Sequence, residues 1–118
     1  MAGDKLEGGI DLDALNELRD TMGEVFISLL DTYKTTMIEN FEVLNKAIEE
    51  SDDKTLERIV HSIKSSSANF GGMRVSEVAK RLEDKYRDGD IQNAREEIAG
   101  LENDYQAFQA KLDEYTNN

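Results

Sequence analysis

One stretch of the chain combines residue types that could do chemistry. It reads RIVHSIKSSSANFGG over residues 58–72 and holds His61, the only histidine among 118 residues. An exposed imidazole is mostly neutral at pH 7 and can act as a nucleophile. Lys64 follows three positions later, where a helix would let its ammonium reach an anionic group on His61. Phosphoryl transfer suits this pair, because positioning and nearby cations supply most of its catalysis.

The side chains expected around His61 are mostly small or charged. Small side chains leave an imidazole accessible to a second protein, and serine hydroxyls could orient the ring or bond a phosphate oxygen. Serine is only a middling helix former, so helix propensity does not explain the serine run. The expected docking face consists of Glu57, Arg58, Ser65, Ser66 and Ala68.

Apolar residues recur every three or four positions along nearly the whole chain, which predicts helices throughout. No segment alternates with a period of two over a useful length. The predicted fold is all-α: an antiparallel four-helix bundle with a short extra N-terminal helix. We expect residues 1–9 to be a flexible lead-in and residues 10–116 to form a single domain. The first helix is expected to begin at Asp11 or Asp13 and to end near Gly23, and the second to cover residues 24–50. The third should begin at 51–53 and end at Gly71, and the fourth should end at 88–90. The last helix should begin at Asp90.

On the third predicted helix, His61 falls nearly opposite the apolar side. A helix turns by ~100° per residue, which puts His61 about 140° from Leu56 at the centre of the apolar stripe. Ser67 lies on the inward stripe, where it would allow close packing or bond a carbonyl one turn back. Gly71 would take the left-handed conformation that ends a helix. A buried core histidine is therefore disfavoured, and an idle exposed histidine remains the alternative.

The composition excludes several classes of function. The net charge of −12 should repel nucleic acid and anionic lipid. Residues 54–87 nevertheless carry eight basic and four acidic side chains, a local +4 that could attract an acidic partner. One histidine and no cysteine leave too few groups for a protein-only metal site or a hydrolase. Without a long apolar run or a signal-peptide core, we expect a cytoplasmic protein with no membrane insertion.

The segment VHSIKSSSANFGG resembles the signature of histidine-containing phosphotransfer (HPt) domains. The matching positions are the histidine, an aliphatic residue two positions on, the lysine, the small run and the glycine ten positions on. The predicted order of helices is also similar to that of the family over nearly the whole chain. The family commonly has glycine after the lysine, where this chain has Ser65, and a smaller aliphatic residue where it has Phe70. We expect Ser65 to narrow the approach of a partner and Phe70 to be a variation in the core only.

The resemblance implies that His61 takes a phosphoryl group from an aspartate of a receiver domain and passes it to another response regulator. It implies a phosphotransfer intermediate that has no ATP site or autokinase activity of its own and binds no cofactor, while Mg²⁺ belongs to the receiver. The implied partners are receiver domains of response regulators or of a hybrid sensor kinase. By analogy with the family, Lys80 and Arg87 on the next helix would lie beside His61 as supporting cations.

The alternative function is a pure interaction module, whose His61 face docks a partner without chemistry. The two readings differ in one result: an interaction module would still work after His61→Gln, whereas a phosphotransfer protein would not. We expect a monomer, since four helices can close their own core, although the regular apolar seam of the last helix could also serve a dimer.

Overall fold

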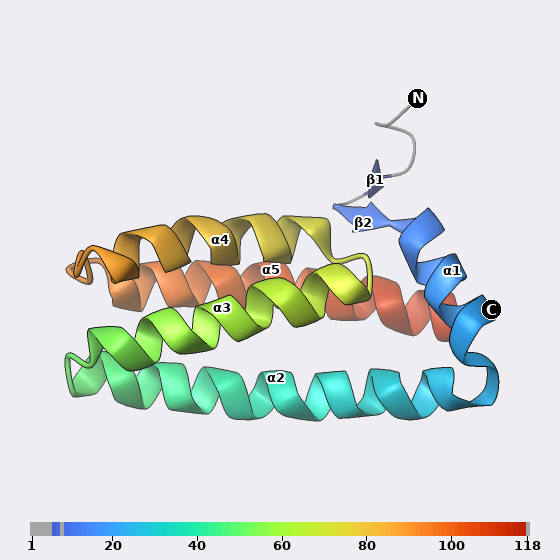
Figure 1. The fold of residues 1–118 in the computed structure, drawn as a ribbon, viewed down its shortest axis with the longest axis horizontal. Coiled ribbons are helices and arrows are strands. Elements are labelled where there is room, and N and C mark those ends of the chain that lie inside the picture. Colours follow the sequence, from blue (N-terminus) through green and yellow to red (C-terminus); the bar gives the residue numbers. More distant parts are fainter. Residues whose placement is uncertain (1–5, 8, 118) are drawn as a thin grey trace.

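The computed structural model describes residues 6–7 and 9–117 and shows a bundle of long helices (Figure 1). The helices α2 (Phe26–Glu49), α3 (Asp53–Asn69), α4 (Met73–Arg87) and α5 (Ala94–Thr116) run alternately up and down. The shorter α1 (Leu12–Met22) crosses one end of the bundle and joins α2 through a 3-10 turn at Gly23–Val25. The predicted all-α bundle with an extra N-terminal helix is confirmed.

The helix limits follow from local capping. The carboxylate of Asp11 accepts the backbone N–H of Ala14 at the start of α1, and Asp52 accepts that of Thr55 at the start of α3. The prediction that Asp90 caps the last helix is wrong. A turn intervenes, in which the N–H of Ala94 bonds the carbonyl of Ile91, and α5 begins only there.

A two-stranded antiparallel hairpin precedes α1, which the sequence pattern did not predict because its strands have two residues each. Strand β1 (Leu6–Glu7) pairs with β2 (Ile10–Asp11), so part of the predicted lead-in at 1–9 is paired, while residues 1–5 and 8 lie outside the described residues. The carbonyl of Gly9 accepts the N–H groups of Met73 and Arg74, and so the hairpin caps α4 in place of a side chain.

The core lies between the four long helices and takes one stripe from each. Most stripe residues predicted from the periodicity are buried, including Leu30, Leu56, Ile63 and Leu101. Ser67 is also fully buried, but its hydroxyl bonds the Tyr33 hydroxyl of α2 at 2.7 Å rather than a carbonyl one turn back.

The turn between α3 and α4 is tight. Gly71 has a φ of +78°, the left-handed conformation predicted for the end of the helix. A Cβ at Gly71 would also lie 2.5 Å from the carbonyl oxygen of Asp11. The turn returns the chain so that α4 runs beside α3 (Figure 1).

Candidate functional site

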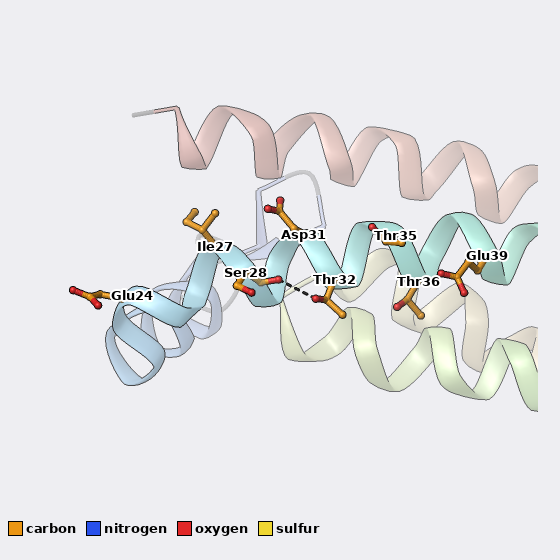
Figure 2. A pocket seen from close by; sticks show the side chains of 8 residues that line it. All are labelled: Glu24, Ile27, Ser28, Asp31, Thr32, Thr35, Thr36 and Glu39. Carbon is orange, nitrogen blue, oxygen red and sulfur yellow. Dashed lines mark hydrogen bonds between the residues drawn. The ribbon is translucent and has the colours of Figure 1, made fainter.

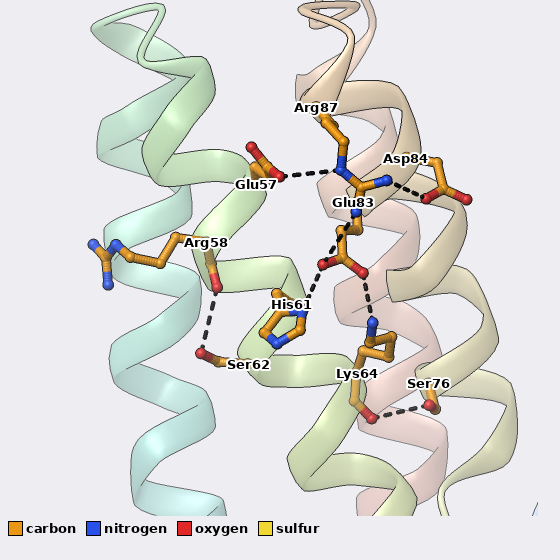
Figure 3. A network of polar contacts seen from close by, with 9 residues as sticks. All are labelled: Glu57, Arg58, His61, Ser62, Lys64, Ser76, Glu83, Asp84 and Arg87. Carbon is orange, nitrogen blue, oxygen red and sulfur yellow. Dashed lines mark hydrogen bonds and ion pairs between the residues drawn. The ribbon is translucent and has the colours of Figure 1, made fainter.

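His61 lies on the surface of α3, as the helical geometry predicted. Its side chain is 58% exposed, and it points towards α4 rather than into the core (Figure 3). Leu56 and Ile63 on the opposite side of α3 are fully buried, so the core holds the helix and leaves the imidazole outside.

The imidazole is held by an acidic residue of α4. The Nδ1 atom of His61 lies 2.5 Å from Oε2 of Glu83, whose side chain is only 7% exposed. Lys64 donates to the other oxygen of the same carboxylate, at 2.6 Å from Oε1. Figure 3 shows the carboxylate between the two basic side chains, so Glu83 ties two residues of α3 to α4.

The carboxylate of Glu83 is ionised at neutral pH. Burial by itself would raise its pKa, but the hydrogen bonds from Lys64 and His61 outweigh burial and lower the pKa from its usual 4.5. An ionised carboxylate can only accept hydrogen bonds, so the Nδ1 of His61 carries the proton and donates it. In a neutral ring, Nε2 then keeps its lone pair on the solvent side.

Arg87, at the C-terminal end of α4, contacts the acidic residues around the site. Its Nη2 lies 3.6 Å from Oε2 of Glu83, its Nε bonds Glu57 of α3 at 3.3 Å, and its Nη1 bonds Asp84 at 3.2 Å. The predicted position of Arg87 beside His61 is therefore found, but its charge is already shared among three acids. Arg87 supports Glu83 and does not approach the imidazole directly.

Lys80 differs from Arg87 and Lys64. It is exposed, and within the described part of the chain it makes no hydrogen bond or ion pair. It lies one turn before Glu83 on α4, and so it borders the site without taking part in the network. Its predicted role as a supporting cation remains a prediction.

In the structure, the residues of the expected docking face lie on two different flanks of α3. Arg58 and Ser65 are exposed near His61, Glu57 is half-buried by its bond to Arg87, and Ala68 is half-buried. Ser66 lies on the other flank of α3, where it faces α2. Its hydroxyl points to the carbonyl of Ile63 at 3.5 Å, so it cannot orient the ring as predicted.

Ser66 borders an apolar groove of about 350 Å³ between α1, α2 and the C-terminal end of α3. The floor includes Phe70, which is 8% exposed and stacks on the ring of Tyr33 with 4.9 Å between centroids. Ser66 follows His61 by five positions, so it lies about 1.4 turns further along α3 and on a different flank of the helix. The remaining lining residues are Leu18, Leu29, Thr32, Thr36 and Asn69.

A second hollow in the described part of the chain differs from the His61 site. A hollow of about 610 Å³ on the outer face of α2 is lined mainly by threonines and acids, from Glu24 in the preceding 3-10 turn to Glu39 (Figure 2). Its one drawn hydrogen bond runs from the Thr32 hydroxyl to the Ser28 carbonyl, within the helix. Over residues 6–7 and 9–117 there is no cluster of metal-binding side chains, and no helix is long and apolar enough to cross a membrane.

Glu83 is a site residue for which the sequence pattern indicates no role. By helical periodicity it shares one flank of the fourth helix with Ser76, Lys80 and Arg87. A usable signal is its spacing of seven residues from Ser76, two helical turns, which puts both at the edge of the apolar stripe. Ser76 is buried too, and its hydroxyl donates to the Lys64 carbonyl at 2.9 Å.

The fold and the site define a helical bundle that presents one histidine, oriented by a buried carboxylate and flanked by cations. The chain belongs to the Hpt domain family, whose model matches residues 28–111. It is thereby a histidine phosphotransfer protein of the kind that acts in phosphorelays. Among solved structures it is similar to histidine-containing phosphotransfer protein B (HptB) from Pseudomonas aeruginosa PAO1. The TM-score is 0.86 at 26% identity, covering 91% of this chain and 93% of that chain. No curated protein matches the chain.

Proposed function

We propose that His61 is the phosphoacceptor and that it carries the phosphoryl group on Nε2. The observation that carries this proposal is the bond between Nδ1 and the buried Glu83, which leaves Nε2 as the free nucleophilic nitrogen on an exposed ring. Membership of the Hpt domain family supports it. The donor in this proposal is the aspartyl phosphate of a receiver domain, which belongs to a response regulator or a hybrid sensor kinase.

In the transfer step the Nε2 lone pair attacks phosphorus, an N–P bond forms, and the P–O bond to the aspartate breaks. The receiver carboxylate leaves, and the ring becomes cationic. Glu83 stabilises that cation through the Nδ1–H bond. Transfer to a second receiver reverses the step: its aspartate oxygen attacks phosphorus and His61 Nε2 leaves.

Lys64 is placed to stabilise the transferred group. Its ammonium lies 2.6 Å from Glu83, and its side chain is 28% exposed, so it can turn from the carboxylate towards the phosphoryl oxygens. Phosphoryl transfer depends mainly on such charge stabilisation and on positioning. Mg²⁺ and the acidic pocket belong to the receiver, and the chain acts as a carrier rather than an autokinase.

The partner would dock over the exposed ring of His61 and the apolar groove next to Ser66. The imidazole faces α4 and the apolar groove faces α2, so a partner that contacts both would lie across the exposed face of α3 between them. A receiver seated there would cover Ser65, where the family usually has glycine. Replacing Ser65 by glycine should therefore change the rate of transfer to individual receivers more than it changes stability.

The test uses a panel of receiver domains phosphorylated on aspartate and mixed with the wild-type chain. We expect an acid-labile, base-stable phosphate on the wild type, none on His61→Gln, and an Nε2 linkage in ³¹P–¹⁵N NMR of the ring. Full labelling of His61→Gln would disprove the proposal. Binding of a receiver without any transfer would favour the interaction module instead.

A further inference from the structure

Arg87 is better suited than Lys64 to bind a phosphoryl group, because a planar guanidinium can donate two parallel hydrogen bonds. In the structure, however, each guanidinium nitrogen lies near a carboxylate. Nε lies 3.3 Å from Oε2 of Glu57, Nη1 lies 3.2 Å from Oδ1 of Asp84, and Nη2 lies 3.6 Å from Oε2 of Glu83. Arg87 is therefore surrounded by acids before any phosphoryl group arrives.

Glu57 differs from the other two acids because it lies on α3, the helix that carries His61. It precedes His61 by four positions, about one helical turn, so the two side chains share a flank of α3. Asp84 and Glu83 belong to α4, like Arg87 itself. The bond from Arg87 to Glu57 therefore joins the two helices next to the imidazole (Figure 3).

Glu57 holds the guanidinium more firmly than Asp84 does. The Glu57 side chain is 35% exposed, against 59% for Asp84, and a less exposed carboxylate is screened less by water and salt. The hydrogen bond to Glu57 is also the main reason why the pKa of the Arg87 guanidinium is raised. The pair still lies close enough to the surface for the arginine side chain to turn away if Glu57 is removed.

A phosphoryl group on Nε2 of His61 would attract the guanidinium of Arg87. Such a group carries close to two negative charges and three acceptor oxygens. If Arg87 turned to it, the phosphorylated chain would be stabilised in its ground state, and the phosphoryl group would leave less readily. A carrier that must give up its phosphoryl group works better when this strong ligand is kept away from it. Glu57 is placed to do so.

We propose that Glu57 is a positioning residue, which keeps Arg87 on the carboxylates and away from the phosphoryl group on His61. Arg87 then supports Glu83 in both the free and the phosphorylated chain, and the phosphoryl group stays easy to transfer to a second receiver. This inference rests on the proposed function, since it takes His61 as the phosphoacceptor. It adds a control over how tightly the phosphoryl group is held.

The test measures the equilibrium constant of phosphoryl transfer from one phosphorylated receiver domain to the full chain. In Glu57→Gln this constant should rise roughly two- to fivefold in favour of the phosphorylated chain, the range expected for an exposed ion pair. The matched control is Glu96→Gln, which removes the same charge from an exposed position on α5. Its equilibrium constant should equal that of the wild type.

A double-mutant cycle with Arg87→Gln decides whether Glu57 acts through the guanidinium. In the Arg87→Gln background, Glu57→Gln should no longer change the equilibrium constant, whereas a general structural role of Glu57 would give the same change in both backgrounds. The ¹⁵Nε signal of Arg87 gives a second readout. On phosphorylation it should shift strongly in Glu57→Gln and stay near its original position in the wild type.

Equal equilibrium constants for Glu57→Gln and the wild type would overturn the inference, as would an effect of Glu57→Gln that persists without Arg87. An Arg87 signal that shifts as much in the wild type would show that the guanidinium already reaches the phosphoryl group. In each of these cases the wild type is still labelled, so His61 remains the phosphoacceptor. A wild type that takes no label from any receiver would instead overturn that assignment, and this inference with it.

Discussion

Glu83 of α4 accepts the Nδ1–H of His61 of α3, with 2.5 Å between Nδ1 and Oε2, although the Glu83 side chain is nearly buried. A surface histidine is thereby held by a group anchored in the core. The orientation of the ring depends on the packing of two helices rather than on its own neighbours in the sequence.

Replacement of Glu83 by alanine should slow phosphorylation of His61 by roughly 10- to 100-fold, the cost seen when a metal-binding histidine loses its orienting carboxylate. Glu83→Gln keeps an oxygen that can accept the Nδ1–H, so its loss should be much smaller. The measurement is the initial rate of phosphotransfer from one phosphorylated receiver. Equal rates in both variants would show that ring orientation does not limit transfer.

Stability should fall on acidification in a way that depends on Glu83. Its pKa is lower in the folded chain than its usual 4.5, because the hydrogen bonds from Lys64 and His61 outweigh burial. The stabilisation is therefore complete above about pH 4.5 and is lost as the pH falls through the folded pKa. The free energy of unfolding, measured in urea between about pH 3 and 6, should depend less on pH in Glu83→Gln than in the wild type. Asp52 is unaltered in that variant and keeps its own contribution.

The hydroxyl pair between Tyr33 and Ser67 should contribute to stability only while both partners are present. Burial raises the pKa of Tyr33, and Ser67 gives its hydroxyl a buried hydrogen bond of 2.7 Å. Ser67→Ala leaves the tyrosine hydroxyl unsatisfied and should cost about 1–3 kcal/mol in the free energy of unfolding. The Tyr33→Phe/Ser67→Ala double variant should lose less than the sum of the single changes. Strict additivity in urea unfolding would rule out this coupling.

Replacement by alanine should have opposite effects on stability at two glycines. Gly100→Ala has free space and an exposed helical position, so it should stabilise the chain by about 0.5–1 kcal/mol. Gly71→Ala places a Cβ against the Asp11 carbonyl at a φ of +78° and should destabilise by more than that amount. The melting temperatures of the two variants test this. A Gly71→Ala variant as stable as the wild type would contradict the described turn.

The N-terminal hairpin should protect the start of α4. Ile10 is 3% exposed and forms a bridge with Gly72, next to the bonds from Met73 and Arg74 to the Gly9 carbonyl. Ile10→Ala should cost about 2 kcal/mol or more. It should also speed hydrogen exchange at the amides of Met73 and Arg74, and less so at the start of α3, which Asp52 caps. Unchanged exchange at those two amides would show that α4 does not need the hairpin.

The sequence by itself determined the helical bundle, the outward direction of His61 and the short reach to Lys64. Each follows from periodicity along a single helix, which is a local property of the chain. It also indicated the positive φ at Gly71, since few residues accept that conformation at the end of a helix.

Only the tertiary structure decided which side chains of α4 meet those of α3 and α5. The flank that carries Glu83, Lys80 and Arg87 was visible in the sequence, but their different roles were not. Glu83 reaches the imidazole, Arg87 binds three acids and Lys80 stays in solvent. The same holds for Ser66, which lies on the flank of α3 that faces α2. Contacts between helices depend on their relative register and rotation, and these are fixed by how all the apolar stripes pack together.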